Sequence, residues 1–138
     1  MRRILIDTNI VIDLLAIREP FYKDAAKLFS LADKNKAKLS ISALSIANTN
    51  YVLLKSNTAS EAREILRKFK ILTTVLPLND KIIDLSLNND EFNDFEDAIQ
   101  YYTAIENNLD IIITRNLKDF RKSQIPVMTA SEYLKTIK

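Results

Sequence analysis

Two short runs of almost uninterrupted apolar, β-branched residues constrain the fold of this chain more than any other feature. They cover residues 3–6 and 110–114. Runs of this length and composition are typical of strands buried on both faces of a sheet. Three further stretches have strand character, and the last is the shortest: residues 38–42, 73–77 and 126–128. A sheet built from such strands needs helices on both of its faces.

Helical periodicity fills the intervals between these runs. We expect helices over residues 10–17, 20–34, 43–55, 60–70, 80–87, 94–107 and 131–137. Side chains suited to N-caps precede several of them, namely Thr58, Asn79, Asp94 and Thr129. Strands that alternate with helices predict the α/β class, as a three-layer α/β/α fold around a central parallel sheet of four or five strands. The length fits one domain over residues 1–138.

The composition excludes whole classes of chemistry. The chain has no cysteine, histidine or glycine, which rules out disulfides, zinc–thiolate sites, histidine catalysis and glycine-rich phosphate loops. Positions that need positive φ must then use Asn or Asp. Oxygen ligands remain, and these suit Mg²⁺ or Mn²⁺. The missing cysteines and a first apolar run too short for a signal peptide or membrane span predict a cytoplasmic protein.

Asp7 directly follows the first predicted strand. Ligands of parallel α/β sheets bind beyond the carboxyl ends of the strands. A carboxylate at the edge of an apolar core needs compensation, and a metal ion is one form of it. The alternative is that Asp7 only caps the next helix, and its position supports both interpretations equally.

Asp94 and Asp97 stand at the start of a late helix, where residues three apart share one face. Locally, the simpler interpretation is that Asp94 is the N-cap and that Asp97 is stabilised by the helix dipole. However, Asp90, Glu91 and Glu96 crowd the same segment. Like charges this close repel one another, and a bound cation would relieve the repulsion.

Thr114 and Asn116 follow the fourth predicted strand. Their oxygens can ligate a metal or bind water. The alternative, which is better supported locally, is that Asn116 caps a short turn over residues 117–120 with Asp119 in it.

The order of these groups resembles the PIN domain, the nuclease fold of VapC-type toxins. The segment ILIDTNIVID at residues 4–13 resembles the opening motif of that family. The segments DFEDAIQ at residues 94–100 and IIITRNLKDF at residues 111–120 resemble its closing half. The resemblance extends from residue 4 to about residue 134.

The resemblance implies a Mg²⁺- or Mn²⁺-dependent endoribonuclease that hydrolyses RNA phosphodiester bonds as the toxin of a toxin–antitoxin pair. It implies metal ligation by Asp7, Asp97 and Asp94, which together with Asn116 form the expected catalytic set. The expected supporting residues are Thr8, Asn9, Asn48 and Thr114. The chain departs from the family at Asn48 and Asn116, where the family usually has acids. The alternative is therefore a PIN-like module that binds RNA or a protein partner without cutting.

Basic residues after the fourth strand are candidates for RNA backbone contacts, namely Arg115, Lys118, Arg121 and Lys122. The alternative for each is a solvated surface, since the net charge is only +2. By resemblance we also expect a homodimer and a small antitoxin protein, and no membrane association. A phosphotransfer domain with Asp7 as nucleophile is disfavoured, because one such class needs a second acid where Asn9 stands.

Overall fold

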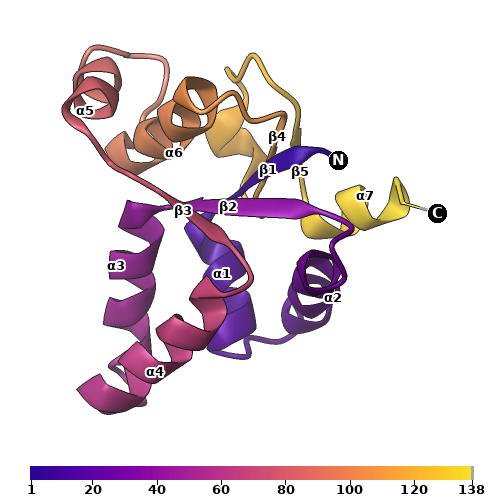
Figure 1. Ribbon diagram of the computed structural model, residues 1–138. Helices are drawn as coiled ribbons and strands as arrows, with labels where there is room; N and C mark the ends of the chain where they lie inside the picture. Colours follow the sequence, from indigo (N-terminus) through magenta and orange to yellow (C-terminus); the bar gives the residue numbers. More distant parts are fainter. Residues whose placement is uncertain (138) are drawn as a thin grey trace.

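The computed structural model describes residues 1–137 and contains one five-stranded sheet in the order β3-β2-β1-β4-β5. All four strand pairings are parallel, which confirms the predicted parallel sheet. The strands are β1 Arg3–Ile6, β2 Lys38–Ser42, β3 Thr74–Leu76, β4 Ile111–Ile113 and β5 Val127–Met128. β1 lies in the middle of the sheet, between β2 and β4 (Figure 1).

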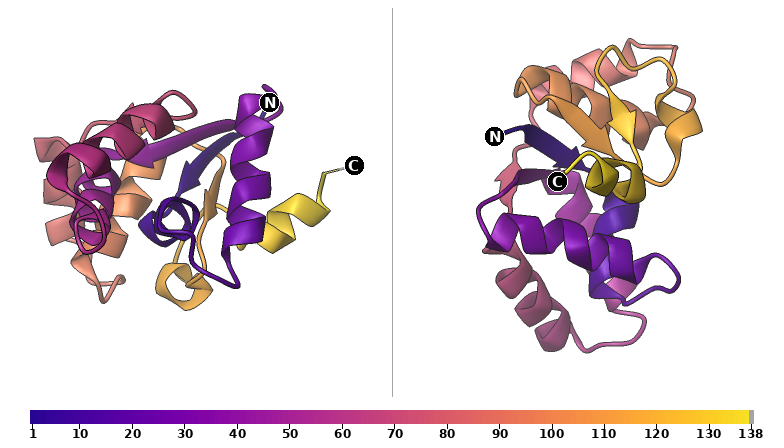
Figure 2. Two further views of the ribbon diagram at one scale, coloured as in Figure 1. Left: turned by 90° about the horizontal axis from the view of Figure 1, so that it is seen from below. Right: turned by 90° about the vertical axis from the view of Figure 1, so that its right-hand side faces the viewer.

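Helices cover both faces of the sheet and complete a three-layer α/β/α arrangement, as Figures 1 and 2 show. α5 and α6 lie on one side, and α1, α2 and α7 lie on the other. The helices are α1 Thr8–Leu15, α2 Tyr22–Asp33, α3 Ala43–Leu53, α4 Ala59–Lys70, α5 Asp80–Leu87, α6 Phe95–Glu106, η1 Leu117–Phe120 and α7 Ala130–Lys135.

The central strand is buried on both faces, as its composition predicts. Ile4 and Ile6 belong to the apolar cluster beneath α1 and α2, whereas Leu5 belongs to the cluster beneath α6. All three side chains are inaccessible to solvent, and burying each contributes about 1.5–3 kcal/mol. The apolar run 3–6 therefore holds the two helical layers together, and its carboxyl end lies at one edge of the core.

Helix ends follow the predicted cap chemistry. Thr58, Asn79, Asp94 and Thr129 are all N-caps whose side chains accept backbone N–H bonds. The first helix begins at Thr8, earlier than expected, because Asp7 is its N-cap and accepts from the Thr8 N–H at 2.8 Å. The local capping interpretation of Asp7 and Asp94 is thus confirmed, and the capping bonds engage only Oδ1 of each carboxylate.

Positive φ angles occur at Asn35 (57°) and Asn108 (55°), which confirms that asparagine takes these positions in a glycine-free chain. Ile17, with φ 52°, differs from this expectation. A β-branched residue is strained in this region. Its position directly after α1 turns the chain sharply there.

Within residues 1–137, no helix combines the length and the apolar character that crossing a membrane requires.

Candidate functional site

A cavity of about 520 Å³ lies between α1, α3, α6 and η1, beyond the carboxyl end of β1. We call it the acid cleft, because Asp7, Asp94, Asp97 and Asp119 all line it. These aspartates come from distant parts of the chain and meet as the parallel sheet requires. None of the four takes part in a salt bridge within residues 1–137. The cleft therefore gathers negative charge that these residues leave unpaired.

The structure places most of the predicted site residues at this cleft. Its wall includes Thr8, Asn9, Asn48, Arg115 and Asn116 as well as the predicted acids. Thr114 is buried directly beneath Asp7, and Lys118 and Arg121 lie outside the residues that line the cavity.

Asp7 is held rigidly by neutral donors. Its Oδ1 accepts from the Thr8 N–H, and its Oδ2 accepts from the Thr114 hydroxyl at 2.8 Å and the Asn9 amide at 3.4 Å. The side chain is 6% exposed. Burial raises the pKa of Asp7, while the bonds from Thr114 and Thr8 oppose that rise. This carboxylate is oriented by the chain and is not neutralised by it.

The start of α6 brings further acids into the cleft. Asp94 accepts from the backbone N–H groups of Glu96 (2.8 Å) and Asp97 (3.2 Å). Burial, followed by repulsion from Asp94, Asp7, Asp119 and Glu96, raises the pKa of Asp97 to about 7. Carboxylates that repel one another so strongly favour the uptake of either a proton or a cation.

Two acids that sequence reasoning did not assign to the site stand beside the two amide substitutions. The Asn48 amide donates to the Glu96 carboxylate at 3.1 Å. Asp119 shares the acid cleft with Asn116. The spacing of Asn116 and Asp119, three residues apart on a predicted turn, is the signal that could have found Asp119. Nothing local indicates the Glu96–Asn48 contact, because it joins two separate helices.

Neutral groups form the base of the cleft. The Gln100 amide nitrogen donates to the Thr8 hydroxyl (3.1 Å) and to the Ser45 hydroxyl (3.0 Å). Gln100 Oε1 is buried without a hydrogen-bond partner among the described residues. Asn116 precedes η1 but makes no side-chain cap bond, so the predicted capping role is wrong and its amide remains available to the cleft.

The donor set fits a hard divalent cation. It consists of carboxylate, amide and hydroxyl oxygens, which Mg²⁺ and Mn²⁺ prefer, and it includes the unpartnered Gln100 Oε1. In the part of the chain that the structure describes, no three acidic side chains already surround one point closely enough to hold a metal. Mg²⁺ needs only one or two carboxylates, with water and substrate phosphate supplying the remaining ligands.

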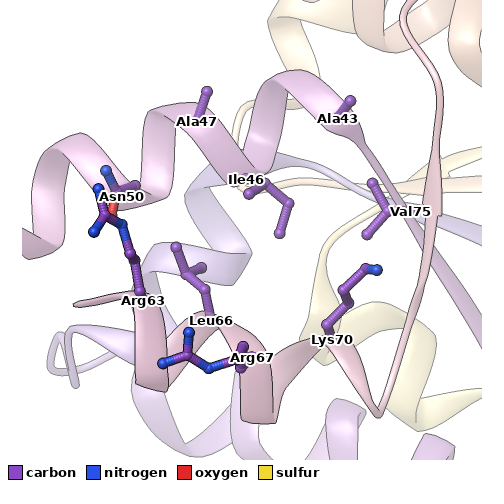
Figure 3. A pocket seen from close by; sticks show the side chains of 9 residues that line it. All are labelled: Ala43, Ile46, Ala47, Asn50, Arg63, Leu66, Arg67, Lys70 and Val75. Atoms are coloured by element: carbon purple, nitrogen blue, oxygen red, sulfur yellow. The ribbon is translucent and has the colours of Figure 1, made fainter. Parts of the chain in front are cut away.

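Figure 3 shows a second cavity, of about 480 Å³, between α3 and α4 and away from the acid cleft. Ile46, Leu66 and Val75 form its apolar part. α4 adds three cations, Arg63, Arg67 and Lys70. We call it the basic groove, since the residues that line it include no acid.

The chain belongs to the PIN domain family, whose model matches residues 3–118. It is 26% identical over 134 residues to Ribonuclease VapC1 of Aquifex aeolicus (strain VF5), covering 95% of this chain and 92% of that protein. A toxin–antitoxin complex from Klebsiella pneumoniae contains a chain 28% identical to it, with a TM-score of 0.67 over 91% of this chain and 96% of that one. VapBC2 from Rickettsia felis, bound to a promoter DNA fragment, shares the fold at 18% identity, with a TM-score of 0.68 and coverage of 91% and 96%.

Proposed function

We propose that this protein is a divalent-metal-dependent endoribonuclease that hydrolyses RNA phosphodiester bonds in the cytoplasm. The observation that carries the proposal is the convergence in one cleft of four aspartates that have no salt-bridge partner among residues 1–137. Membership of the PIN domain family and the similarity to a ribonuclease support it. By the same similarities we propose that residues 1–138 act as one domain and as the toxin of a toxin–antitoxin pair.

Asp7, Asp94 and Asp97 are the residues that would hold Mg²⁺ or Mn²⁺, and Asp119 adds negative charge beside them. Such an ion activates water for attack and neutralises charge on the scissile phosphate. Thr114 fixes the orientation of Asp7 through its hydroxyl. The Asn116 amide can position water or a phosphate oxygen, and the unpartnered Gln100 Oε1 can accept a hydrogen bond from water.

Asp7→Asn tests the proposal. The substitution keeps the shape of the side chain and removes its charge, so cleavage of single-stranded RNA with Mg²⁺ or Mn²⁺ should fall by at least about a hundredfold. Asp33→Asn, at the exposed C-terminal end of α2, is the matched control and should retain full activity. Undiminished metal-dependent cleavage by Asp7→Asn would rule out the assigned site.

A module that binds RNA or a protein without cutting is the second candidate. Two observations favour it: Asn48 and Asn116 replace acids, and no three acids of residues 1–137 are already gathered around one point. Titration with Mn²⁺, followed by an RNA cleavage assay, separates the candidates. Metal-free RNA binding with no cleavage at any metal concentration would establish the second.

We also propose that the basic groove receives the antitoxin. Its apolar part and its three cations fit a peptide segment that carries apolar and acidic side chains. Arg63→Glu combined with Arg67→Glu should abolish binding of the cognate antitoxin while RNA cleavage persists.

We also propose a homodimer, as the family resemblance implies. Analytical ultracentrifugation of the unsubstituted protein tests it.

A further inference from the structure

A buried ion cluster next to the acid cleft has no assigned purpose in the proposed function. Asp13, on α1, is 1% exposed and binds two arginines. Its Oδ1 accepts from Arg18 Nε at 3.1 Å, and its Oδ2 accepts from Arg115 Nε at 2.7 Å. Arg18 Nη2 and Arg115 Nη2 lie 3.0 and 3.2 Å from Oδ1. One carboxylate therefore holds two guanidinium groups in place.

The cluster carries more positive charge than Asp13 requires. A single arginine would neutralise the buried carboxylate, and a second cation in the same place adds an unbalanced charge. Each guanidinium has five N–H donors. The bonds described engage only Nε and Nη2 of each arginine, so the Nη1 groups remain available for a further acceptor.

Both arginines belong to the wall of the acid cleft. Their side chains are 41% exposed for Arg18 and 28% for Arg115, whereas Asp13 beneath them is not accessible. An incoming anion would therefore meet the guanidinium groups and not the carboxylate that holds them.

The chain fixes both arginines by unusual means. Ile17 adopts its strained positive φ directly before Arg18, whose backbone N–H donates to the Asp13 carbonyl at 3.0 Å. This reversal returns Arg18 to the helix that carries Asp13. Arg115 is fixed from the other side, since its Cζ lies 3.9 Å from the centre of the Phe21 ring. Guanidinium groups held in this way lose little side-chain entropy when they bind a ligand.

We infer that Asp13 is a positioning residue that holds Arg18 and Arg115 at the wall of the acid cleft, where both bind RNA phosphate groups. The inference rests on the proposed function for the identity of the ligand. It explains how a polyanion enters a cleft lined by aspartates, because guanidinium groups match phosphate geometry and supply charge beside the acids. The sequence pattern predicted Arg115 as a phosphate contact, and the inference adds Arg18 as a second one.

Asp13→Asn separates this inference from simple electrostatics. The substitution removes one negative charge beside the cleft, so charge alone predicts tighter RNA binding. Positioning predicts the opposite, because a neutral amide with one acceptor oxygen cannot hold two guanidinium groups. We expect the Kd for a short single-stranded RNA, measured in EDTA by fluorescence anisotropy, to rise about tenfold.

Arg18→Gln and Arg115→Gln complete the test, and each leaves one guanidinium on Asp13. Each should reduce the slope of log K against log salt by about 0.7, the value for one phosphate contact on a single strand. Arg2→Gln is the matched control, because Arg2 is exposed near the N-terminus and lines neither the acid cleft nor the basic groove. Its salt slope should equal that of the unsubstituted protein. If Asp13→Asn does not fold, Arg18→Gln and Arg115→Gln still test whether the two arginines bind phosphate.

The inference fails if folded Asp13→Asn binds RNA as tightly as the unsubstituted protein. It also fails if Arg18→Gln and Arg115→Gln change the salt slope no more than Arg2→Gln does. Binding in EDTA requires no cleavage. A protein that shows these effects and never cuts RNA would therefore lose the nuclease proposal and keep this one, and a nuclease indifferent to both arginines would do the reverse.

Discussion

Asp7 caps the start of α1 and Asp13 lies within that helix. Both side chains are almost fully buried, but their surroundings differ in charge. Asp13 contacts two arginines. Among the described residues, only the neutral donors Thr8, Asn9 and Thr114 bond the Asp7 carboxylate, and its cavity contains further aspartates. Burial of a lone carboxylate costs several kcal/mol. Within residues 1–137 the chain supplies cations to Asp13 and none to Asp7.

This difference gives a way to separate structural from functional charges in the molecule. A buried acid with its own cations is expected to hold the fold together or to orient those cations. A buried acid that faces other acids destabilises the metal-free protein and is retained for what it binds. Four substitutions or conditions test the comparison, and the largest expected effect comes first.

Removal of both partners of Asp13 should have the largest effect on stability. Arg18→Ala combined with Arg115→Ala leaves a fully buried carboxylate without a cation, so the free energy of unfolding should fall by about 3–5 kcal/mol. Urea denaturation in EDTA measures it, and each single substitution serves as a control with a smaller loss. A double variant as stable as the singles would show that Asp13 does not depend on these cations.

Divalent metal should stabilise the protein through Asp7 and not through Asp13. At a hundredfold excess over Kd, Mn²⁺ should add about 2.7 kcal/mol to the free energy of unfolding. Asp7→Asn should lose this gain, while Asp13→Asn and the control Asp33→Asn should keep it. Equal gains in Asp7→Asn and the unsubstituted protein would contradict the comparison.

In EDTA the two substitutions should change thermal stability in opposite directions. Asp7→Asn removes a carboxylate whose pKa is raised by burial, so its melting temperature should rise by roughly 3 °C. Asp13→Asn breaks two ion pairs and should lower the melting temperature. Differential scanning calorimetry measures both, and a lower value for Asp7→Asn would show that its neutral hydrogen bonds outweigh the cost of its charge.

The smallest expected effect is the pH dependence due to Asp97, because its side chain is only partly buried and solvent screens its interactions with the other acids. Its pKa is raised from 3.8 to about 7 in the folded protein, so between these values the folded state binds more protons than the unfolded state. The stabilisation is complete below about pH 4 and is lost as the pH rises through about 7. Chemical denaturation in EDTA should show this decline, and Asp97→Asn should make it shallower. If the free energy of unfolding of the unsubstituted protein rises between about pH 4 and 7, while that of Asp97→Asn does not, the raised pKa of Asp97 is contradicted.

Local patterns in the sequence predicted the architecture well. The five strand runs, the alternation with helices and the caps at Thr58, Asn79, Asp94 and Thr129 all appear in the structure. These features depend on backbone propensity and burial within short segments, which neighbouring residues encode directly. The convergence of Asp7 with Asp94 and Asp97 was implied by the resemblance to the PIN domain, and the cavity that all three line agrees with it.

Other features of the site were not predictable in this way. Asp13 belongs to the motif segment 4–13 but has no local property that indicates two arginine partners. Its contact with Arg115 joins residues that are 102 positions apart. The hydrogen bond between Glu96 and Asn48 also joins distant residues. Nor did any local pattern indicate that Gln100 Oε1 would be buried without a partner among the described residues. Such contacts depend on how helices from different layers face one another.

The sequence by itself determined that this chain forms a parallel sheet between two helical layers, with acids at the strand ends. It did so because alternating strand and helix periods leave few ways to bury every apolar face. Only the tertiary structure decided that Asp13 is neutralised by two arginines of the chain, whereas Asp7 shares its cleft with further acids. That outcome depends on interatomic distances between remote side chains, since electrostatic energy in a low-dielectric interior changes steeply with separation.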